Sequence, residues 1–137
     1  MDIIEKAVNY KRYLSVCNSS VCERLAVQVL QNRLLYLEEY RDLTEKGLHV
    51  LSQWIDQQEL LDLIAPQGTP YAYVKYLGED STMKLCRRIL NEEAVLVMPA
   101  EVFEDKMAFR LTFGRTLDVL RPGLERISTV LKDTEGA

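Results

Sequence analysis

An arginine inside a predicted strand is the side chain of this sequence most suited to binding an anion. Arg110 lies in the alternating segment Met107–Phe113, in which every second residue is large and apolar. It shares the other face of that strand with Ala108 and Thr112. A guanidinium there needs solvent, a carboxylate or a bound anion, and its planar fork fits a carboxylate. Periodicity alone also fits a solvated face of a one-sided sheet, so both interpretations stay open.

The other reactive side chains form no recognisable catalytic or metal-binding set. His49 is the single histidine, and the sequence places no acidic partner beside it, so we interpret it as a helix-surface or interface residue. Cys17 and Cys22 are too few for a structural zinc site, which needs about four ligands. With Cys86 they form an odd and sparse set, which predicts reduced thiols in a cytoplasmic protein. We expect no catalytic residue and no metal ligand in this chain.

Composition and charge are typical of a soluble globular protein. Hydrophobic residues make up 47% and charged residues 28% of the chain, which is too apolar for a disordered segment. The formal net charge of −4 does not provide the positive field that non-specific nucleic-acid binding needs. No apolar stretch approaches the roughly 20 residues that cross a bilayer. Nucleic acid and membrane are therefore not expected partners.

The first half of the chain has the periodicity of helices. Apolar residues recur at helical spacing over Val21–Leu37, and a second stripe runs over Tyr40–Ile64. The sequence therefore predicts a long helix up to the break at Pro66–Pro70. Such a helix is longer than a domain of this size usually needs, which suggests that it connects two bodies.

The second half predicts alternating strands and helices. Tyr71–Tyr76 is aromatic and β-branched, typical of a strand, and a helix capped by Asp80 or Ser81 follows. Val95–Met98 predicts a strand buried on both faces. The alternating strand comes next, and then a last helix, in which Pro122 predicts a kink or a separate first turn. We expect an α/β (α+β) fold, in which long helices precede a small β-α-β-β-α domain.

These segments resemble the C-terminal part of class I/II pyridoxal-phosphate-dependent aminotransferases of fold type I. Val95–Phe103 followed by Phe109–Gly114 is similar to the family signature, roughly V-x-V-x-P-G-x-x-F and then R-L-x-F. The upstream order is also similar, with Tyr10–Ser15, a turn at Cys17–Ser20, one helix and then a long helix. The resemblance spans nearly the whole chain, and the order of these motifs is more specific than any one of them.

The resemblance implies particular site residues. Arg110 matches the arginine that binds the α-carboxylate of the substrate. Ser15 and Asn18 fall in a segment that lies at the family's dimer interface, near the cofactor phosphate of the partner subunit, although turn and cap chemistry explains them as well. The implied protein is a homodimeric transferase that uses pyridoxal 5'-phosphate, an amino acid and a 2-oxo acid.

The resemblance also implies that the chain is a truncated, C-terminal portion. In the family, the Schiff-base lysine and a phosphate-binding arginine precede the matching region, and Lys6 and Lys11 do not stand in that context. We expect residues 1–38 to be the helical end of a missing N-terminal PLP-binding domain, 39–65 a long connecting helix, and 66–137 the C-terminal small domain. No cofactor is then expected on a lysine of this chain, and the fragment alone is not expected to transaminate.

Two residues depart from the family pattern. Ala100 and Glu104 replace glycines that relieve backbone constraint in the loop facing the active site, which leaves the loop conformation and side-chain selectivity open. An alternative is a self-contained, non-catalytic α/β binding or dimerisation module with Arg110 on an exposed or effector-binding face. The two interpretations differ over the Val21–Leu37 stripe, which a missing domain would leave uncovered or buried in an oligomer contact.

Overall fold

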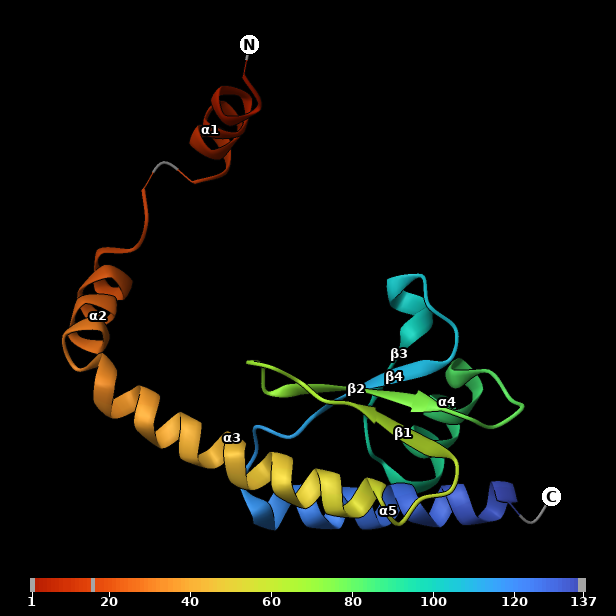
Figure 1. Cartoon of the computed structure of the whole chain (residues 1–137). Helices are drawn as coiled ribbons and strands as arrows, with labels where there is room; N and C mark the ends of the chain where they lie inside the picture. The colour runs from red at the N-terminus through yellow and green to blue at the C-terminus, as the bar shows by residue number, and fades with distance from the viewer. Residues whose placement is uncertain (1, 16, 136–137) are drawn as a thin grey trace. The chain divides into compact units, whose positions relative to one another are not determined.

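The chain forms two compact units, Met1–Glu39 and Tyr40–Ala137, in the computed structural model, which describes residues 2–15 and 17–135. The first unit consists of two helices and the start of a third, and the second unit contains the sheet. The helices of the first unit are α1 (Ile3–Leu14), α2 (Ser20–Gln31) and the beginning of α3 (Arg33–Ile55) (Figure 1).

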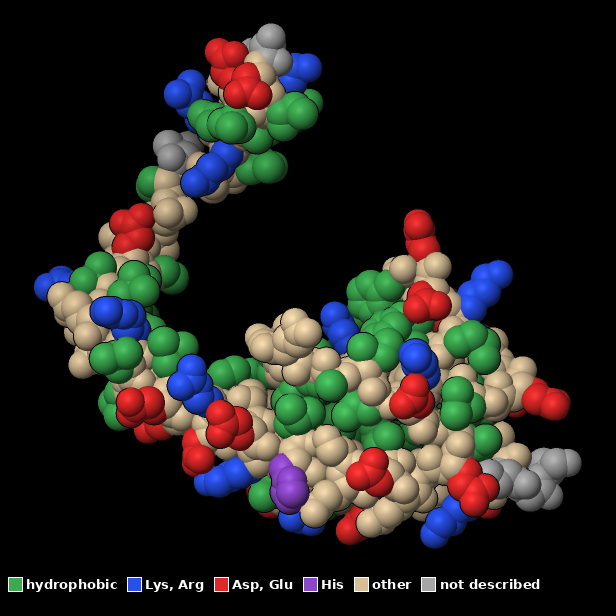
Figure 2. Space-filling view, viewed as in Figure 1, with side chains coloured by type: hydrophobic (Ala, Val, Ile, Leu, Met, Phe, Trp, Pro, Cys, Tyr) green, Lys and Arg blue, Asp and Glu red, His purple; other side chains and the backbone are tan. Residues whose placement is uncertain are grey.

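The first unit presents apolar side chains at its surface. Among their described residues, helices α1 and α2 bury none, and Figure 2 shows hydrophobic side chains (green) along both helices. The predicted Val21–Leu37 stripe is therefore uncovered in this chain, with exposed fractions such as 67% for Val21 and 63% for Leu30. The stripe consists of Val21, Leu25, Val29, Leu30, Leu34 and Leu37.

The second unit is built on a four-stranded antiparallel sheet with the strand order β1-β2-β4-β3. Arg110, in an inner strand, lies opposite Tyr73 on one side and Met98 on the other. Directly opposite residues point to the same face of a sheet, so these three form one row. The elements of this unit after α3 are β1 (Leu61–Ile64), β2 (Tyr71–Tyr76), α4 (Thr82–Glu93), β3 (Met98–Pro99), η1 (Ala100–Phe103), β4 (Ala108–Thr112) and α5 (Leu117–Glu135).

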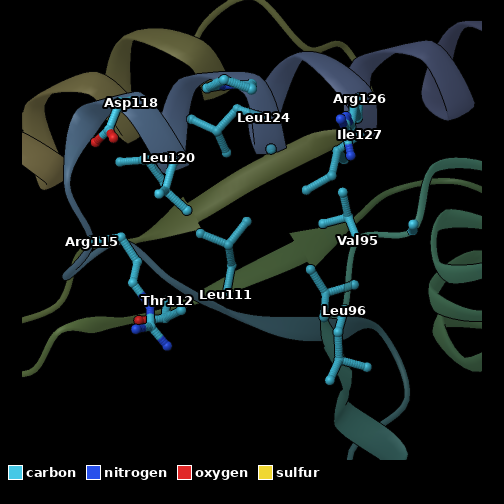
Figure 3. Close-up of a pocket in the computed structure, with 15 residues that line it drawn as sticks. Val95, Leu96, Leu111, Thr112, Arg115, Asp118, Leu120, Leu124, Arg126 and Ile127 are labelled. Carbon is cyan, nitrogen blue, oxygen red and sulfur yellow. The ribbon is translucent and has the colours of Figure 1, made fainter.

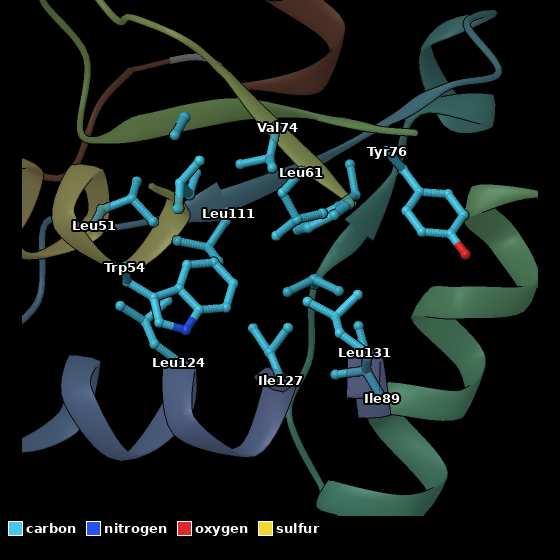
Figure 4. Packing of buried hydrophobic residues seen from close by; sticks show 14 of the residues in the cluster. Leu51, Trp54, Leu61, Val74, Tyr76, Ile89, Leu111, Leu124, Ile127 and Leu131 are labelled. Carbon is cyan, nitrogen blue, oxygen red and sulfur yellow. The ribbon is translucent and has the colours of Figure 1, made fainter. Parts of the chain in front are cut away.

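The C-terminal half of α3, helix α4 and helix α5 cover the other face of the sheet (Figure 1). Trp54 Nε1 donates a hydrogen bond to Ser128 Oγ at 2.7 Å, which links α3 to α5. Helix α3 closely approaches the backbone just after β4 at Gly47, where a Cβ would collide with the carbonyl oxygen of Phe113. The largest fully buried side chains of this core (Figure 4) include Leu51, Val74, Tyr76, Leu85, Ile89, Phe109, Phe113, Ile127 and Leu131.

This architecture confirms the predicted α/β (α+β) class but corrects the helix predicted over residues 39–65. Helix α3 ends at Ile55, and Leu61–Ile64 forms strand β1, in which Leu61 is buried and Asp62 is exposed. A short apolar run fits helical spacing as well as strand alternation, and pairing with β2 decides for the strand. The small domain therefore begins with two strands, and its order is β-β-α-β-β-α.

The prediction of a strand over Val95–Met98, buried on both faces, was wrong. Only Met98 and Pro99 pair with β4, and Leu96 is 80% exposed while Val97 is buried. Helix α4 ends in the left-handed residue Ala94, at φ 54°, and the chain then runs to β3, the edge strand of the sheet. An edge strand is paired on one side only, and β3 is so short that Val95, Leu96 and Val97 lie outside the sheet.

Two predicted features of the helices had different outcomes. Ser81 is the N-cap of α4, and its Oγ accepts a hydrogen bond from the Lys84 N–H at 3.3 Å, which confirms one of the two predicted caps. The separate first turn predicted at Pro122 is absent, because α5 is one helix from Leu117 to Glu135. Pro122 lies near the start of α5, where its missing N–H removes only one backbone hydrogen bond. Within the described residues, no helix has the length and apolarity needed to cross a membrane.

Candidate functional site

Arg110 lies on the open face of the sheet between two aromatic rings. Its guanidinium carbon is 4.9 Å from the centre of the Tyr71 ring and 5.1 Å from the centre of the Phe103 ring, and both distances are typical of cation–π contacts. Nη2 also donates to Met98 Sδ at 3.4 Å, and a thioether is only a weak acceptor. These contacts hold the side chain without a strong hydrogen-bond acceptor.

Arg110 has no ion-pair partner among the described residues. The side chain is partly buried, so it is neither extended into bulk water nor locked against an internal acid. Its N–H groups are therefore available to an external anion, and their planar arrangement fits a carboxylate. The ion pairs of the described residues join Lys46 to Asp42, Lys75 to Asp62, Lys84 to Asp80 and Arg88 to Glu92.

The ring of Phe103 is carried by the short helix η1, which a carboxylate ties to helix α4. Glu101 accepts a hydrogen bond from Thr82 Oγ1 at 2.7 Å and one from the Met83 N–H at 2.9 Å. Burial alone would raise the pKa of the Glu101 carboxyl, but the hydrogen bonds from Thr82 and from backbone N–H groups outweigh it and lower that pKa. The Glu101 carboxylate is therefore ionised at neutral pH and joins the two segments.

A second carboxylate holds the loop that follows η1. Asp105 accepts a hydrogen bond from the Tyr73 hydroxyl at 2.9 Å and another from the Lys106 N–H at 2.7 Å. The bond from Tyr73 is the main reason why the pKa of Asp105 is lowered, whereas burial and then the same bond raise the pKa of Tyr73. Since Tyr73 lies opposite Arg110, this bond ties the loop to the row of residues around the guanidinium.

The two departures from the glycine pattern fall at the ends of η1. Glu104 has a left-handed backbone, at φ 63°, a conformation that glycine adopts without a steric cost. Ala100 is fully buried at φ < 0, and its methyl group is part of the packed interior. The loop therefore forms with both side chains present, at the expense of strain at Glu104.

A groove of about 510 Å³ lies beside the end of β4, and Arg110 is not among the residues that line it. The first turns of α5, the end of β4 and the segment before β3 line it, and Figure 3 shows Leu96, Leu111 and Arg115 around it. Leu111 points to the face opposite to Arg110 and Thr112 to the same face, but Arg110 itself does not line the groove, so the two sites are treated separately. The sequence pattern gave no sign of this groove.

A comparison with protein families supplies the assignment. Residues 2–127 match the model of a family described as aminotransferase class I and II. The chain belongs to this family. Two of the similar proteins named below are described as aminotransferases, one of them as PLP-dependent, which agrees with the predicted resemblance.

Several known proteins are similar to the chain in sequence or in structure. Capreomycidine synthase from Streptomyces vinaceus is 25% identical over 95% of this chain and 34% of its own length. An aspartate aminotransferase from Thermotoga maritima is 32% identical over 50% of this chain and 18% of its own length. The crystal structure of a PLP-dependent aminotransferase from Streptococcus suis matches with a TM-score of 0.87 at 28% identity, over 92% of this chain and 34% of that one. The chain thus spans about a third of the length of capreomycidine synthase and of the Streptococcus suis protein.

The lysines of the chain do not fit the covalent attachment of pyridoxal phosphate. A Schiff-base lysine is activated by burial or by a neighbouring cation, whereas every lysine here is exposed. Lys46, Lys75 and Lys84 form surface ion pairs with carboxylates. No step of the cofactor's chemistry is therefore assigned to them.

Ser15 and Asn18 lie in the first unit, and both make local contacts. Ser15 is the C-cap of α1, and its N–H donates to the Lys11 carbonyl oxygen at 2.8 Å. Asn18 lies just before α2, and its Nδ2 donates a hydrogen bond at 3.2 Å to Oε1 of Glu23, which lies in the first turn of that helix. These bonds are the cap and turn chemistry that the sequence left open, and a role at a dimer interface stays a prediction.

The remaining reactive side chains have ordinary surroundings. His49 is exposed on α3. Cys17 and Cys22 are free and exposed, while Cys86 is buried, and burial followed by the nearby Glu101 charge raises the pKa of its thiol to about 12. In the described part of the chain, no three His, Cys, Asp or Glu side chains are grouped as a metal site.

Proposed function

We propose that this chain is the C-terminal portion of a PLP-dependent aminotransferase that transfers an amino group from an amino acid to a 2-oxo acid. In this proposal, Arg110 binds the α-carboxylate of both substrates, and the Schiff-base lysine belongs to another part of the protein. The observation that supports it is the guanidinium itself, which lies on the open face of the sheet, between Tyr71 and Phe103, with no carboxylate beside it in the described chain.

The contribution of Arg110 is to position the substrate. Two parallel N–H···O bonds fix both the place and the plane of a carboxylate, and the flanking rings limit the rotation of the guanidinium. Anchoring one end of an amino acid or a 2-oxo acid in this way fixes the direction of the bonds at its Cα. Arg110 itself transfers no proton, since a guanidinium stays protonated.

The first unit suggests how the chain joins the rest of such a protein. We propose that residues 1–38 pack against a PLP-binding domain, that helix α3 connects the two bodies, and that residues 61–137, which include strand β1, form the small domain. The uncovered Val21–Leu37 stripe supports this, because a monomeric soluble protein rarely exposes a large apolar surface. A self-contained module would need a core in this region, and the described residues of α1 and α2 are all unburied.

A cytoplasmic homodimer in which Ser15 and Asn18 lie near the partner's cofactor phosphate belongs to the same proposal. It rests on the family resemblance of the segment Tyr10–Ser20.

The carboxylate role can be tested on the 137-residue chain with pyruvate as the probe. The dissociation constant of pyruvate would be measured by titration calorimetry for each protein, and in the wild type the ¹⁵N-labelled Arg110 Nε–Hε resonance would also be followed during the titration. We expect a saturable shift in the wild type and a dissociation constant at least about tenfold higher in Arg110→Lys, since lysine cannot form the bidentate contact. Arg115→Lys is the matched control, because Arg115 is exposed and lies beyond the end of the same strand. Equal affinities for all three proteins would refute the role.

A further inference from the structure

We propose that Glu101 is a positioning residue for Arg110: its carboxylate fastens η1 to the start of helix α4 and thereby holds the Phe103 ring against the guanidinium. The position of the Phe103 ring depends on contacts within this chain. The expected effect on ligand binding rests on the carboxylate role proposed for Arg110.

Glu101 bridges two segments that are distant in the sequence. Its two oxygens accept from Thr82 Oγ1 at 2.7 Å and from the Met83 N–H at 2.9 Å, over sequence separations of 19 and 18 residues. The Met83 N–H belongs to the first turn of α4, where backbone donors have no partner within the helix, and a negative charge is favourable there. Thr82 is completely buried, so its hydroxyl depends on this protein partner and on the more distant Lys106 carbonyl oxygen at 3.3 Å.

The η1 turn is closed by its own backbone hydrogen bonds, but its tip is weakly packed. Its backbone closes through the Glu104 N–H to the Glu101 carbonyl oxygen at 3.3 Å and the Asp105 N–H to the Ala100 carbonyl oxygen at 3.1 Å. Val102 is 60% exposed and Phe103 is 47% exposed, so little apolar burial holds the tip of the turn in place. A movement of Glu101 would therefore carry Phe103 with it.

Two carboxylates lie on either side of Phe103 along the chain and fasten the turn to different elements. Glu101 attaches it to helix α4, and Asp105 attaches it to Tyr73 of β2. The start of the turn is also held, because β3 pairs with β4 and Ala100 is fully buried. The Glu101 bonds add an attachment of the turn to α4, and we infer that this attachment sets the 5.1 Å distance between the Phe103 ring and the guanidinium carbon.

A purely structural role for Glu101 would be limited to capping α4, and Ser81 provides the control for that. Ser81 caps the same helix end through the Lys84 N–H but makes no bond to η1 in the described structure. Ser81→Ala thus weakens the start of α4 and leaves the hydrogen bonds between Glu101 and α4 intact. Glu101→Ala removes those bonds and also weakens the start of α4. Glu101→Gln keeps the side-chain volume and one accepting oxygen, so it provides a variant with a smaller perturbation.

The experiment is to record the Arg110 Nε–Hε resonance in these variants, with Phe103→Leu as the reference for a missing ring. We expect Glu101→Ala to move the resonance most of the way to its Phe103→Leu position, Glu101→Gln to move it part of the way, and Ser81→Ala to leave it at the wild-type position. We also expect the pyruvate dissociation constant to rise about threefold to tenfold in Glu101→Ala and to stay within about twofold in Ser81→Ala.

The two proposals fail in different ways. A resonance in Glu101→Ala and Glu101→Gln that coincides with that in Ser81→Ala would overturn the positioning role. If the resonance moves as expected in the Glu101 variants, but Arg110→Lys binds pyruvate as tightly as the wild type does, the positioning of the ring is supported and the carboxylate role of Arg110 is refuted.

Discussion

Replacing Glu101 by glutamine should destabilise the second unit at neutral pH and have less effect in acid. A hydrogen bond to a charged group contributes about 1.5–3 kcal/mol, and Glu101 accepts two such bonds. Glutamine keeps one accepting oxygen, and the partial exposure of the carboxylate weakens the effect of its charge. We therefore expect a loss of about 1–2 kcal/mol in the free energy of unfolding near neutral pH.

The direction of the pH dependence follows from the lowered pKa of Glu101. A carboxyl whose pKa is lower in the folded than in the unfolded state stabilises the fold above its ordinary pKa, which is 4.5 here. That stabilisation is lost as the pH falls through the folded-state pKa. The difference between wild type and Glu101→Gln should therefore be constant above about pH 6 and shrink towards about pH 3.

Urea denaturation at a series of pH values measures this difference, and Trp54 is a suitable fluorescent probe because it is the single tryptophan and lies in the core of the second unit. Glu104→Gln is the matched control, since Glu104 is exposed at the C-terminal end of the same turn. We expect it to change the unfolding free energy by less than about 0.5 kcal/mol. A Glu101→Gln difference that is absent at neutral pH, or that does not shrink in acid, would refute the reasoning.

Three further outcomes are expected. Ala94→Gly should raise the unfolding free energy by up to about 1 kcal/mol, because Ala94 has a left-handed backbone (φ 54°) and is exposed at the end of α4; a loss in urea denaturation would contradict this. Tyr76→Phe should leave stability unchanged or raise it by about 1 kcal/mol, because the buried Tyr76 hydroxyl has no hydrogen-bond partner in the described structure; a clear loss in the same assay would reveal a partner. Pyridoxal phosphate followed by borohydride should label several exposed lysines incompletely, as read by peptide mass mapping, and stoichiometric labelling of one lysine would show that the chain does hold the cofactor.

The alternation of the last strand was sufficient to place Arg110, because period two fixes which residues share a face. Its aromatic neighbours could not be predicted in the same way. Tyr71 reaches the guanidinium through the register between β2 and β4, and Phe103 reaches it through the η1 turn. Both contacts depend on the assembled sheet, which no local pattern encodes.

Local signals were reliable where one principle dominated and failed where two were balanced. Ser81 acts as a helix cap through a bond that spans three residues, and such chemistry is visible in the sequence. The run Leu61–Ile64 satisfies both helical and strand spacing, and only its pairing with β2 selects the strand. The bonds of Glu101 to Thr82 and Met83 cross 18 or more residues, so they follow from the tertiary structure alone.

The most direct measurement of the central claim is a comparison of two ligands, pyruvate and pyruvamide, on two proteins, the wild type and Arg110→Gln. Pyruvamide has the same carbon skeleton but no negative charge, so the comparison isolates the contact between the ligand's carboxylate and the guanidinium. We expect the wild type to bind pyruvate about tenfold more tightly than pyruvamide and Arg110→Gln to bind both alike. A preference for pyruvate that survives in Arg110→Gln would contradict the account, because the carboxylate would then be recognised elsewhere.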